Sequence, residues 1–392
     1  MNHSKFRAGI LPPFKRLPCT AAVRLLRGAC FPDRDATILS FLWQYRGRGL
    51  ERIVVDLVTG GAGFIGSHLV DRLLSEGRKV RVLDSFVVGR RANLEQHVGN
   101  SRLEVIEADI ADKAAVDHAT ASAERIYHLA ARADVVPSIQ EPEAYFRANV
   151  DGTFAVLEAA RKHGAKRVVY VASSSCYGIP DVYPTPETAP ADARYPYALT
   201  KYLGEQLAMH WAQVYQLPVN SVRFFNVYGP RARTSGTYGA VFGVFLAQLL
   251  AGKELTIVGD GEQSRDFTFV SDVVDALITV ANSNKSGQVY NVGSGAPVTV
   301  NELVRHLGSP PSVHIPKRPG EPDITFADIS KIQRELGWSP KVKFADGVKV
   351  MMDNIDYWRD APVWTVSSIK DATSDWFRFL GSENSLEAKA SM

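Results

Sequence analysis

Short apolar runs recur along the chain and alternate with segments that have helical spacing. The first four runs lie at 53–58, 79–84, 103–109 and 125–130, and a fifth, at 167–173, follows helical spacing over 145–163. Residues 67–77 carry apolar side chains at helical intervals and end at Gly77. Strands that alternate with helices in this way predict crossover connections, and therefore a parallel α/β sheet with helices on both faces. Within the first run, Asp56 is a carboxylate that the pattern does not explain.

From Ser221 onward the alternation is less regular. Short strands are predicted in RFFNVYGP, LTIVGD, RDFTFV and QVYNVG, with helices at 241–251, 272–281 and 300–307. The last of these helices opens with Thr299 and Glu302, which is the pattern of a capping box. We therefore expect a cofactor-binding domain at 52–222, onto which some later segments pack back, and a smaller C-terminal α/β substrate-binding domain at 223–380.

Charge is unevenly distributed along the chain. The net charge of +3 is small, but residues 1–50 contain nine Lys or Arg against Asp33 and Asp35, about +7, which leaves about −4 for the remainder. We expect residues 1–51 to be a basic, non-globular extension, or the product of a start codon placed too early, and residues 381–392 to be a frayed tail. An organelle transit peptide is the alternative, because the segment is rich in Arg and poor in acidic residues, although it is also poor in Ser and interrupted by prolines.

Composition and cysteine usage indicate a soluble globular protein. Apolar residues make up 45% of the chain and charged residues 22%. Cys19, Cys30 and Cys176 are scattered, and an odd number without paired spacing predicts reduced thiols in the cytoplasm. No stretch approaches the ~18 apolar residues of a membrane span, and no secretory signal pattern precedes the first strand. We expect neither a membrane nor a metal as a partner.

The segment TGGAGFIG, between the first strand and its helix, is typical of a dinucleotide site. Its glycines permit a tight turn, close approach of backbone to a pyrophosphate, and close packing of helix and strand: Gly60, Gly63 and Gly66. Phe64 and Ile65 belong to the same turn, and the helix that follows directs amide hydrogens toward the phosphates. Asp84 ends the second strand, where a carboxylate binds ribose hydroxyls and repels a 2′-phosphate. These features predict a Rossmann-type doubly wound sheet that prefers NAD to NADP, although Arg90 and Arg91 follow Asp84 closely.

Tyr197 and Lys201 form a candidate acid–base pair. They lie four residues apart in RYPYALTK, at the start of a segment with helical spacing, and therefore share one helix face. A phenol titrates near ~10 in water, so an unassisted tyrosine is a poor base at neutral pH. We expect the ammonium of Lys201 to lower the pKa of Tyr197 and to make it a competent acid–base group. The same spacing is common by chance on solvated helices, so the interpretation depends on the dinucleotide fold around it.

Five motifs in this order resemble a known family. TGGAGFIG, HLAA, ASSSCYG, YPYALTK and FFNVYGP together are similar to the motifs of the extended short-chain dehydrogenase/reductases. Within these, the chain is most similar to NAD-dependent nucleotide-sugar epimerases such as UDP-glucose and UDP-N-acetylglucosamine 4-epimerases. The resemblance covers about Arg52 to Trp376 and does not include residues 1–51. It implies a homodimer formed through the helix before strand five and the helix of Tyr197.

The resemblance also implies roles for individual residues. Tyr197 takes the proton of a sugar hydroxyl, Lys201 holds the nicotinamide ribose, and Ser173 hydrogen-bonds the same sugar hydroxyl. Cofactor contacts are implied for Asp109 and Ile110 at the adenine and for Leu129, Ala130 and Ala131 of HLAA. Substrate contacts are implied for Asn226 and the arginines Arg265 and Arg318 at the diphosphate, Glu321 at the nucleotide ribose, Val241 at the base, and Thr325 near the sugar.

The serines after Ser173 bear on the reaction. Relatives that dehydrate a sugar carry Asp-Glu directly after the Ser/Thr, and relatives that decarboxylate UDP-glucuronate carry a Glu two positions after it. Here these positions are Ser174 and Ser175, whose hydroxyls orient a sugar but do no acid–base work at neutral pH. Cys176 comes next and is interpreted as a small buried residue. The resemblance therefore implies a 4-epimerase that removes a hydride and returns it to the opposite face.

The sugar and the rival functions stay open at this point. Thr325 is small at a position where some 4-epimerases carry a bulky Tyr, so UDP-GlcNAc and UDP-GalNAc are expected to be tolerated, and a UDP-uronic acid is a further option. The alternatives are a dehydratase or reductase of the same fold, and, in another class, a non-catalytic NAD-bound scaffold or a nucleic-acid binder that uses the basic segment. That segment has no periodic basic stripe, so we expect no nucleic-acid partner.

Overall fold

The computed structural model describes residues 54–232 and 240–381. The chain divides into two units, Met1–Ile53 and Val54–Met392, and the description below concerns the second. The expectations for residues 1–51, for Cys19 and Cys30, and for residues 382–392 lie outside the described residues.

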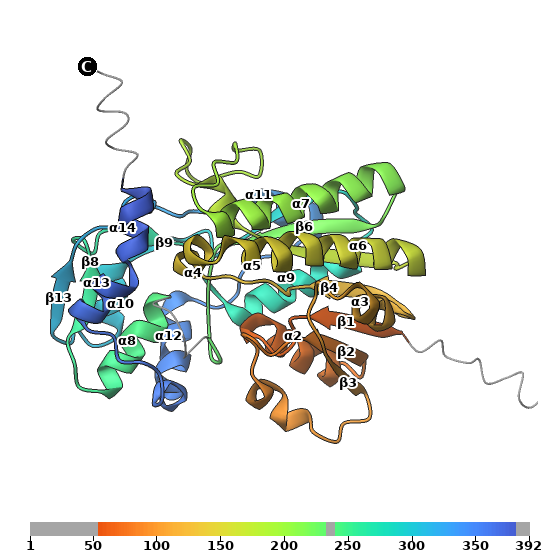
Figure 1. Ribbon diagram of the computed structural model, residues 1–392. Helices are drawn as coiled ribbons and strands as arrows, with labels where there is room; N and C mark the ends of the chain where they lie inside the picture. The colour runs from red at the N-terminus through yellow and green to blue at the C-terminus, as the bar shows by residue number, and fades with distance from the viewer. Residues whose placement is uncertain (1–53, 233–239, 382–392) are drawn as a thin grey trace, which may run out of the picture. The chain divides into compact units, whose positions relative to one another are not determined.

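The center of the fold is a parallel sheet, as the alternating pattern predicted, and it has seven strands (Figure 1). In chain order the strands are β1 (Val55–Thr59), β2 (Lys79–Asp84), β3 (Leu103–Glu107), β4 (Ala123–His128), β5 (Arg167–Ser173), β6 (Val219–Phe224) and β11 (Val289–Val292). Their order across the sheet is β11-β6-β5-β4-β1-β2-β3, and neighbouring strands run parallel. The order reverses between β1 and β4, so a crevice opens there at the carboxyl ends of the strands. The fold is the predicted Rossmann-type doubly wound sheet.

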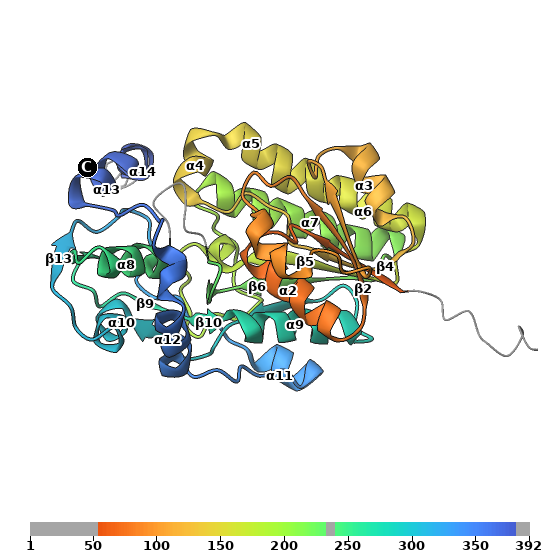
Figure 2. The same ribbon diagram turned by 90° about the horizontal axis from the view of Figure 1, so that it is seen from below.

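Helices cover both faces of the sheet (Figures 1 and 2). One face is packed by α3 (Lys113–Thr120), α6 (Gly152–His163) and α7 (Pro196–Tyr215), with α4 (Val135–Gln140) and α5 (Pro142–Phe146) against α7. The other face is packed by α2 (Phe64–Ser75), α9 (Val270–Asn282) and α11 (Ser330–Leu336). Both faces of the central strands are therefore buried, which explains why these strands read as continuous apolar runs. The helical segment predicted at 145–163 is divided, because a π-helical turn, Arg147–Asp151, separates α5 from α6.

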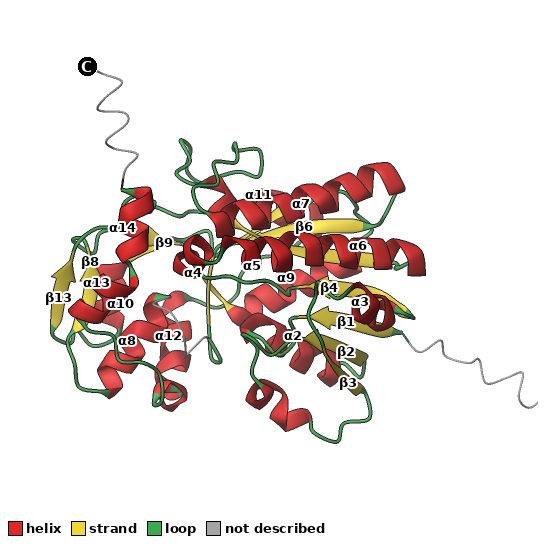
Figure 3. Cartoon of the chain, viewed as in Figure 1, coloured by secondary structure: helices red, strands yellow, loops and turns green. Residues whose placement is uncertain are grey.

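A second layer of structure, rich in helices and two-stranded sheets, lies beside the carboxyl ends of the strands (Figure 3). Its helices are α8 (Val241–Leu250), α10 (Val300–His306), α12 (Phe344–Asp353), α13 (Val366–Ala372) and α14 (Ser374–Leu380). Its strands pair as β7 (Asn226–Tyr228) with β10 (Phe267–Phe269), β8 (Leu255–Val258) with β13 (Ser312–Ile315), and β9 (Ser264–Arg265) with β12 (Val298–Thr299). Three short 3-10 helices, Arg91–His97, Ser174–Tyr177 and Ile355–Trp358, complete the elements named along the described chain. The stacked rings of Tyr228 and Phe242, with Phe267 edge-on to Phe242, form the center of this layer's core.

Segments after residue 222 contribute to both layers. The predicted boundary between residues 222 and 223 falls inside β6, and β11 and α9 pack into the sheet layer. The chain thus leaves the sheet after β6, builds part of the second layer, and returns to add a strand at the edge. At Thr299 the hydroxyl accepts a hydrogen bond from the amide of Glu302 at 3.0 Å, which caps α10 where the sequence placed its start.

The buried carboxylate of Asp56 links β1 to its surroundings. Its oxygens lie 2.9 Å from Arg78, which precedes β2, and 3.7 Å from Arg125 of β4. Burial raises the pKa of Asp56, and the two guanidinium groups oppose that shift. Because removal of one partner from a buried ion pair leaves an uncompensated charge, Asp56 and its arginines hold each other in place at the end of the sheet opposite the crevice.

Candidate active site

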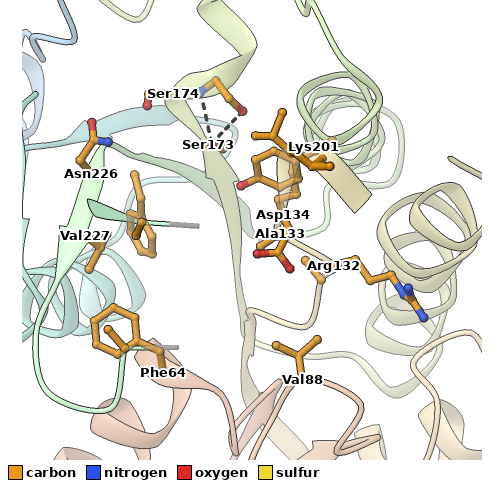
Figure 4. Close-up of a pocket in the computed structure, with 18 of the residues that line it drawn as sticks. Phe64, Val88, Arg132, Ala133, Asp134, Ser173, Ser174, Lys201, Asn226 and Val227 are labelled. Atoms are coloured by element: carbon orange, nitrogen blue, oxygen red, sulfur yellow. Dashed lines mark hydrogen bonds between the residues drawn. The ribbon is translucent and has the colours of Figure 1, made fainter. Parts of the chain in front are cut away.

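One large cavity opens at the carboxyl ends of β1, β4 and β5 and extends into the second layer (Figure 4). Its volume is about 1270 Å³, enough for a dinucleotide and a second large ligand. Every residue that the sequence singled out as a site residue lines it: Gly60, Gly63, Phe64, Ile65, Gly66, Asp84, Asp109, Ile110, Leu129, Ala130, Ala131, Ser173, Ser174, Ser175, Tyr197, Lys201, Asn226, Val241, Arg265, Arg318, Glu321 and Thr325. Residues separated by more than 260 positions in the sequence therefore share one cavity.

The glycine loop forms the cofactor side from backbone atoms. Gly60 has φ +71°, and a Cβ atom there would lie 2.8 Å from the backbone nitrogen of Ala130. A Cβ atom at Gly66 would lie 2.1 Å from the carbonyl oxygen of Gly60, so helix α2 can approach the loop this closely only with glycine there. The N-terminus of α2 faces the cavity and is suited to bind a diphosphate. This arrangement fits the predicted dinucleotide.

Asp84 is buried at the end of β2, and its carboxylate is held by backbone amides. Its oxygens accept hydrogen bonds from the amides of Ala62 and Phe86, each at 2.9 Å. Burial raises the pKa of Asp84, and these two hydrogen bonds oppose that shift. Arg90 donates to the hydroxyl of Tyr357 at 3.1 Å, and Arg91 pairs with Glu107 while its guanidinium lies 4.2 Å from the ring of Phe86. Both arginines therefore have contacts of their own beside Asp84.

Asp109, at the predicted adenine end, is half exposed. Its carboxylate lies 3.0 Å from Arg147 and accepts a hydrogen bond from the amide of Ala111 at 2.9 Å. Ile110 beside it is buried against Gly152, where an added Cβ would lie 2.6 Å from the Ile110 side chain. The two residues form one wall of the cavity.

Tyr197 and Lys201 lie on the same face of α7, one turn apart, as predicted. Lys201 is buried, with its ammonium 4.6 Å from the center of the Tyr170 ring, and Figure 4 shows it on the cavity wall. Burial lowers the pKa of Lys201 to about 7, against the raising effect of Glu205. The pKa of Tyr197 is raised by burial, and a hydrogen bond with Ser173 opposes that shift. In the protein by itself the pKa of Tyr197 is therefore raised by burial, and the expected lowering by the ammonium of Lys201 stays a prediction.

Two of the three serines, Ser173 and Ser175, are hydrogen-bonded to each other beside Tyr197. The hydroxyl of Ser175 donates to Ser173 Oγ at 2.9 Å, and the amide of Ser175 donates to the same oxygen at 3.2 Å. With its oxygen accepting both, Ser173 is oriented to donate its own proton into the cavity. Cys176 is buried, and burial raises the pKa of its thiol to about 12, so its interpretation as a small buried residue is confirmed.

The opposite side of the cavity is built from long polar side chains. Arg265 lies 2.9 Å from Glu321, and Arg318 lies 3.6 Å from the other oxygen of the same carboxylate. The hydroxyl of Thr325 donates to Asn226 at 2.8 Å. These residues come from β7, β9 and the loop that carries residues 317–325, which the fold brings together at the cavity.

Sequence analysis missed several residues at the site. Tyr195 is parallel to Tyr197, with ring centers 6.4 Å apart and planes at 10°, and Trp376 of α14 lies 6.1 Å from Tyr195. Asp134 and Arg132, directly after HLAA, also line the cavity, and Figure 4 shows the side chain of Asp134 directed into it. Their position directly after the HLAA motif was the signal available for these two residues.

His128 of HLAA supports the site without lining it. Its Nδ1 lies 2.7 Å from the hydroxyl of Thr59 and its Nε2 lies 3.0 Å from that of Thr153. Burial lowers the pKa of His128 to about 3, so the ring stays neutral. It therefore connects β1, β4 and α6 directly beneath the cavity.

Over residues 54–232 and 240–381, no cluster of His, Cys, Asp or Glu side chains is arranged to hold a metal ion. No helix in the described part of the chain has both the length and the apolar character needed to cross a membrane.

Comparisons with known proteins place the chain among sugar-nucleotide enzymes. The sequence profile of a family described as GDP-mannose 4,6 dehydratase matches residues 57–351. A UDP-glucose 4-epimerase of Mycolicibacterium smegmatis is 39% identical over 300 residues, which cover 74% of this chain and 95% of the relative. UDP-glucuronic acid decarboxylase 3 of Arabidopsis thaliana is 36% identical over 310 residues, 76% of this chain and 88% of the relative.

Solved structures agree with these relatives. The UDP-glucose 4-epimerase of Thermotoga maritima, solved with UDP-glucose, has a TM-score of 0.72 and 35% identity, covering 78% of this chain and 99% of that one. Similar structures of a dehydratase and of a UDP-glucuronic acid 4-epimerase contain NAD.

Proposed function

We propose that this chain, which belongs to the GDP-mannose 4,6 dehydratase family of NAD-dependent epimerases and dehydratases, is a 4-epimerase of UDP-sugars. The cofactor is NAD, and the glycine loop with Asp84 suits it. The observation that carries the proposal is the Ser173 network. At the two positions where dehydrating and decarboxylating relatives carry carboxyl groups, this cavity has the hydroxyls of Ser174 and Ser175.

The reaction proceeds through a 4-keto sugar. Ser173 and Tyr197 bind the C4 hydroxyl, and Tyr197 takes its proton while the C4 hydrogen leaves as hydride. Bound NAD supplies the hydride acceptor and, after the keto sugar has turned its other face, the donor. Tyr197 then returns the proton to the C4 oxygen, so that atoms and electrons balance and the cofactor ends each turnover as it began. Lys201 holds the nicotinamide ribose next to Tyr197.

The polar side of the cavity binds the nucleotide. Arg265, Arg318 and Asn226 bind the diphosphate, because guanidinium groups suit its planar, charged oxygens. Glu321 binds the nucleotide ribose and Val241 the base. On the cofactor side, Asp109 and Ile110 contact the adenine, and the backbone after His128 approaches the nicotinamide.

The sugar is UDP-GlcNAc with UDP-GalNAc, or UDP-glucose with UDP-galactose. The small Thr325, hydrogen-bonded to Asn226, leaves room for an acetamido group at C2. A UDP-uronic acid is the third option, since one of the similar structures is a UDP-glucuronic acid 4-epimerase. We also propose a cytoplasmic homodimer through α6 and α7, whose Phe154, Leu199, Val214 and Tyr215 are exposed apolar residues, and no nucleic-acid partner.

The test is to incubate the purified protein with UDP-GlcNAc, UDP-glucose and UDP-glucuronate separately, without added NAD, and to follow the anomeric protons by NMR. The C4 epimer of one of them is the expected product, and the substrate that turns over fastest identifies the sugar. A 4-keto, deoxy or pentose product would show that the chain is a dehydratase or decarboxylase. It would contradict the argument from Ser174 and Ser175.

A dehydratase or reductase is the second candidate, because similar proteins include a dTDP-glucose 4,6-dehydratase and several UDP-glucuronic acid decarboxylases. A non-catalytic NAD-bound scaffold requires that all three sugars stay unchanged while NAD is bound.

A further inference from the structure

The family match ends at residue 351, but the described chain continues into α13 and α14, and α14 reaches the cavity. We propose that Trp376 of α14 is a positioning residue that holds Arg318 and its loop ready for the nucleotide diphosphate. The inference rests on the proposed function, because it assigns Trp376 a role in binding that substrate.

Trp376 contacts the loop of Arg318 in two ways. Its indole N–H donates to the carbonyl oxygen of Pro319 at 2.7 Å, and its ring center lies 5.6 Å from the guanidinium of Arg318. The first contact fixes the backbone next to Arg318, and the second fixes the guanidinium over an aromatic face. Residues 316–323 form neither helix nor strand, so contacts of this kind replace a regular element as the support of the arginine.

The other neighbour of Trp376 belongs to the catalytic side. Its ring lies 6.1 Å from Tyr195, which is parallel to Tyr197 at 6.4 Å. Tyr195 directly precedes α7, on which Tyr197 and Lys201 lie. A single buried indole, 6% exposed, therefore joins the loop that carries the diphosphate arginine to the start of the catalytic helix.

Helix α14 is itself held against the cavity. Gln140 at the end of α4 donates to Asp375, the neighbour of Trp376, at 2.8 Å, and Figure 2 shows α14 beside α4. Helix α4 begins directly after Asp134, which lines the cavity. The position of Trp376 thus depends on an element of the sheet layer as well as on its own helix.

The experiment measures binding of UDP to the NAD-loaded protein by calorimetry, for the wild type, Trp376→Ala and Trp376→Phe. We expect about tenfold weaker binding for Trp376→Ala and about threefold for Trp376→Phe, which keeps an aromatic face but loses the N–H donor. The matched control is Phe377→Ala, because Phe377 is the next residue of α14 and is 40% exposed. It should bind UDP like the wild type.

A double-mutant cycle separates positioning from mere folding. In the Arg318→Ala background, Trp376→Phe should weaken UDP binding by less than about 1.5-fold. The effect should shrink because the arginine that Trp376 positions is already absent. An equal effect of Trp376→Phe in both backgrounds, or wild-type affinity in both Trp376 variants, overturns the proposal. Because the cycle compares Phe variants, it stands even where Trp376→Ala fails to fold.

Failure of the proposed function looks different. A wild type that binds dTDP or GDP instead of UDP contradicts the UDP-sugar assignment, and the same cycle is then measured with the nucleotide that binds. A wild type that binds none of the three contradicts both proposals.

Discussion

The two sides of the cavity are lined by different parts of the chain: backbone on the cofactor side and side chains on the substrate side. The cofactor side is backbone, in which Gly60 and Gly66 allow the loop and α2 to approach within distances that any Cβ would block. The substrate side is side chain, in which Arg265, Arg318 and Glu321 form a charged group across segments far apart in sequence. Steric fit controls the first side and electrostatics controls the second. The same size of mutation should therefore have different consequences on the two sides.

Addition of one methyl group to the glycine loop should abolish NAD binding. We expect Gly66→Ala to be isolated without NAD and without measurable activity, because its Cβ would lie 2.1 Å from the Gly60 carbonyl oxygen. Gly63→Ala is the matched comparison, since its Cβ would lie 3.2 Å from the same oxygen, and it should retain part of the NAD. The readouts are bound NAD per protein chain and the melting temperature. Equal NAD content in the two variants would contradict the steric explanation.

Removal of the Tyr197 hydroxyl, which lies between the two sides, should stop the reaction and leave the binding of NAD and of the nucleotide unchanged. We expect Tyr197→Phe to lower kcat by about 10³-fold, within the range for loss of a general acid–base group, while NAD content and UDP affinity stay at wild-type levels. Tyr215→Phe, on the exposed end of the same helix, is the control. A Tyr197→Phe enzyme with more than a tenth of wild-type kcat would show that another group takes the proton.

Loss of hydrogen-bond geometry on the substrate side should weaken substrate binding without abolishing it. Arg265→Lys keeps the charge but loses the planar fork, and we expect the KM of the UDP-sugar to rise about 10- to 30-fold, the effect of a lost hydrogen bond to a charged group. The kcat should change much less, and bound NAD should not change. The measurement is steady-state kinetics on the substrate identified by NMR. If kcat falls as much as KM rises, Arg265 also contributes to the transition state.

The smallest expected effect is on the melting temperature and concerns the buried amine of Lys201, which lies between the two sides. Burial lowers the pKa of Lys201 to about 7, whereas an unfolded chain holds its lysine proton up to about 10.4. Below pH 7 the folded protein bears the full cost of a buried charge, and the cost disappears as the pH rises from about 7 to about 10. In NAD-free protein, Lys201→Met should therefore raise the melting temperature by a few °C more at pH 6 than at pH 9.5.

Lys349→Met, on the exposed face of α12, is the control for the titration of Lys201. A stabilisation by Lys201→Met that does not depend on pH would mean that the amine is neutral, or charged without cost, over this range.

The difference between the two sides also decides what could be predicted from sequence. The glycine loop and the Tyr197–Lys201 pair depend on spacing within one turn of chain, so the motif already contains the geometry. The apolar runs located β2 and β5 to the residue, because continuous apolar segments are what a sheet buried on both faces requires. The parallel sheet followed from that alternation, whereas the addition of β6 and β11 to it did not.

The substrate side could not be derived in this way. Arg265 and Glu321 meet at 2.9 Å across more than fifty residues, and nothing local to either residue predicts the contact. Arg265 and Glu321 were predicted only from the resemblance to a family. The resemblance implied no role for Trp376 or Tyr195, so these two were missed as site residues. The raised pKa of Tyr197 was also missed, because burial is a property of the packed structure and its effect exceeds that of the hydrogen bond with Ser173.

The position of β11 has a consequence for the time course of biosynthesis. The sheet takes this strand from beyond β6 after a detour of about 70 residues, so the chain that has just completed β6 still presents an unpaired strand edge. At a ribosomal rate of about 5–20 residues per second, that edge stays open for about 3–14 s. During this interval the nascent chain is at its most vulnerable to pairing with another strand. Helix α7 already covers one face of β6, and α9, which is made just before β11, covers the other.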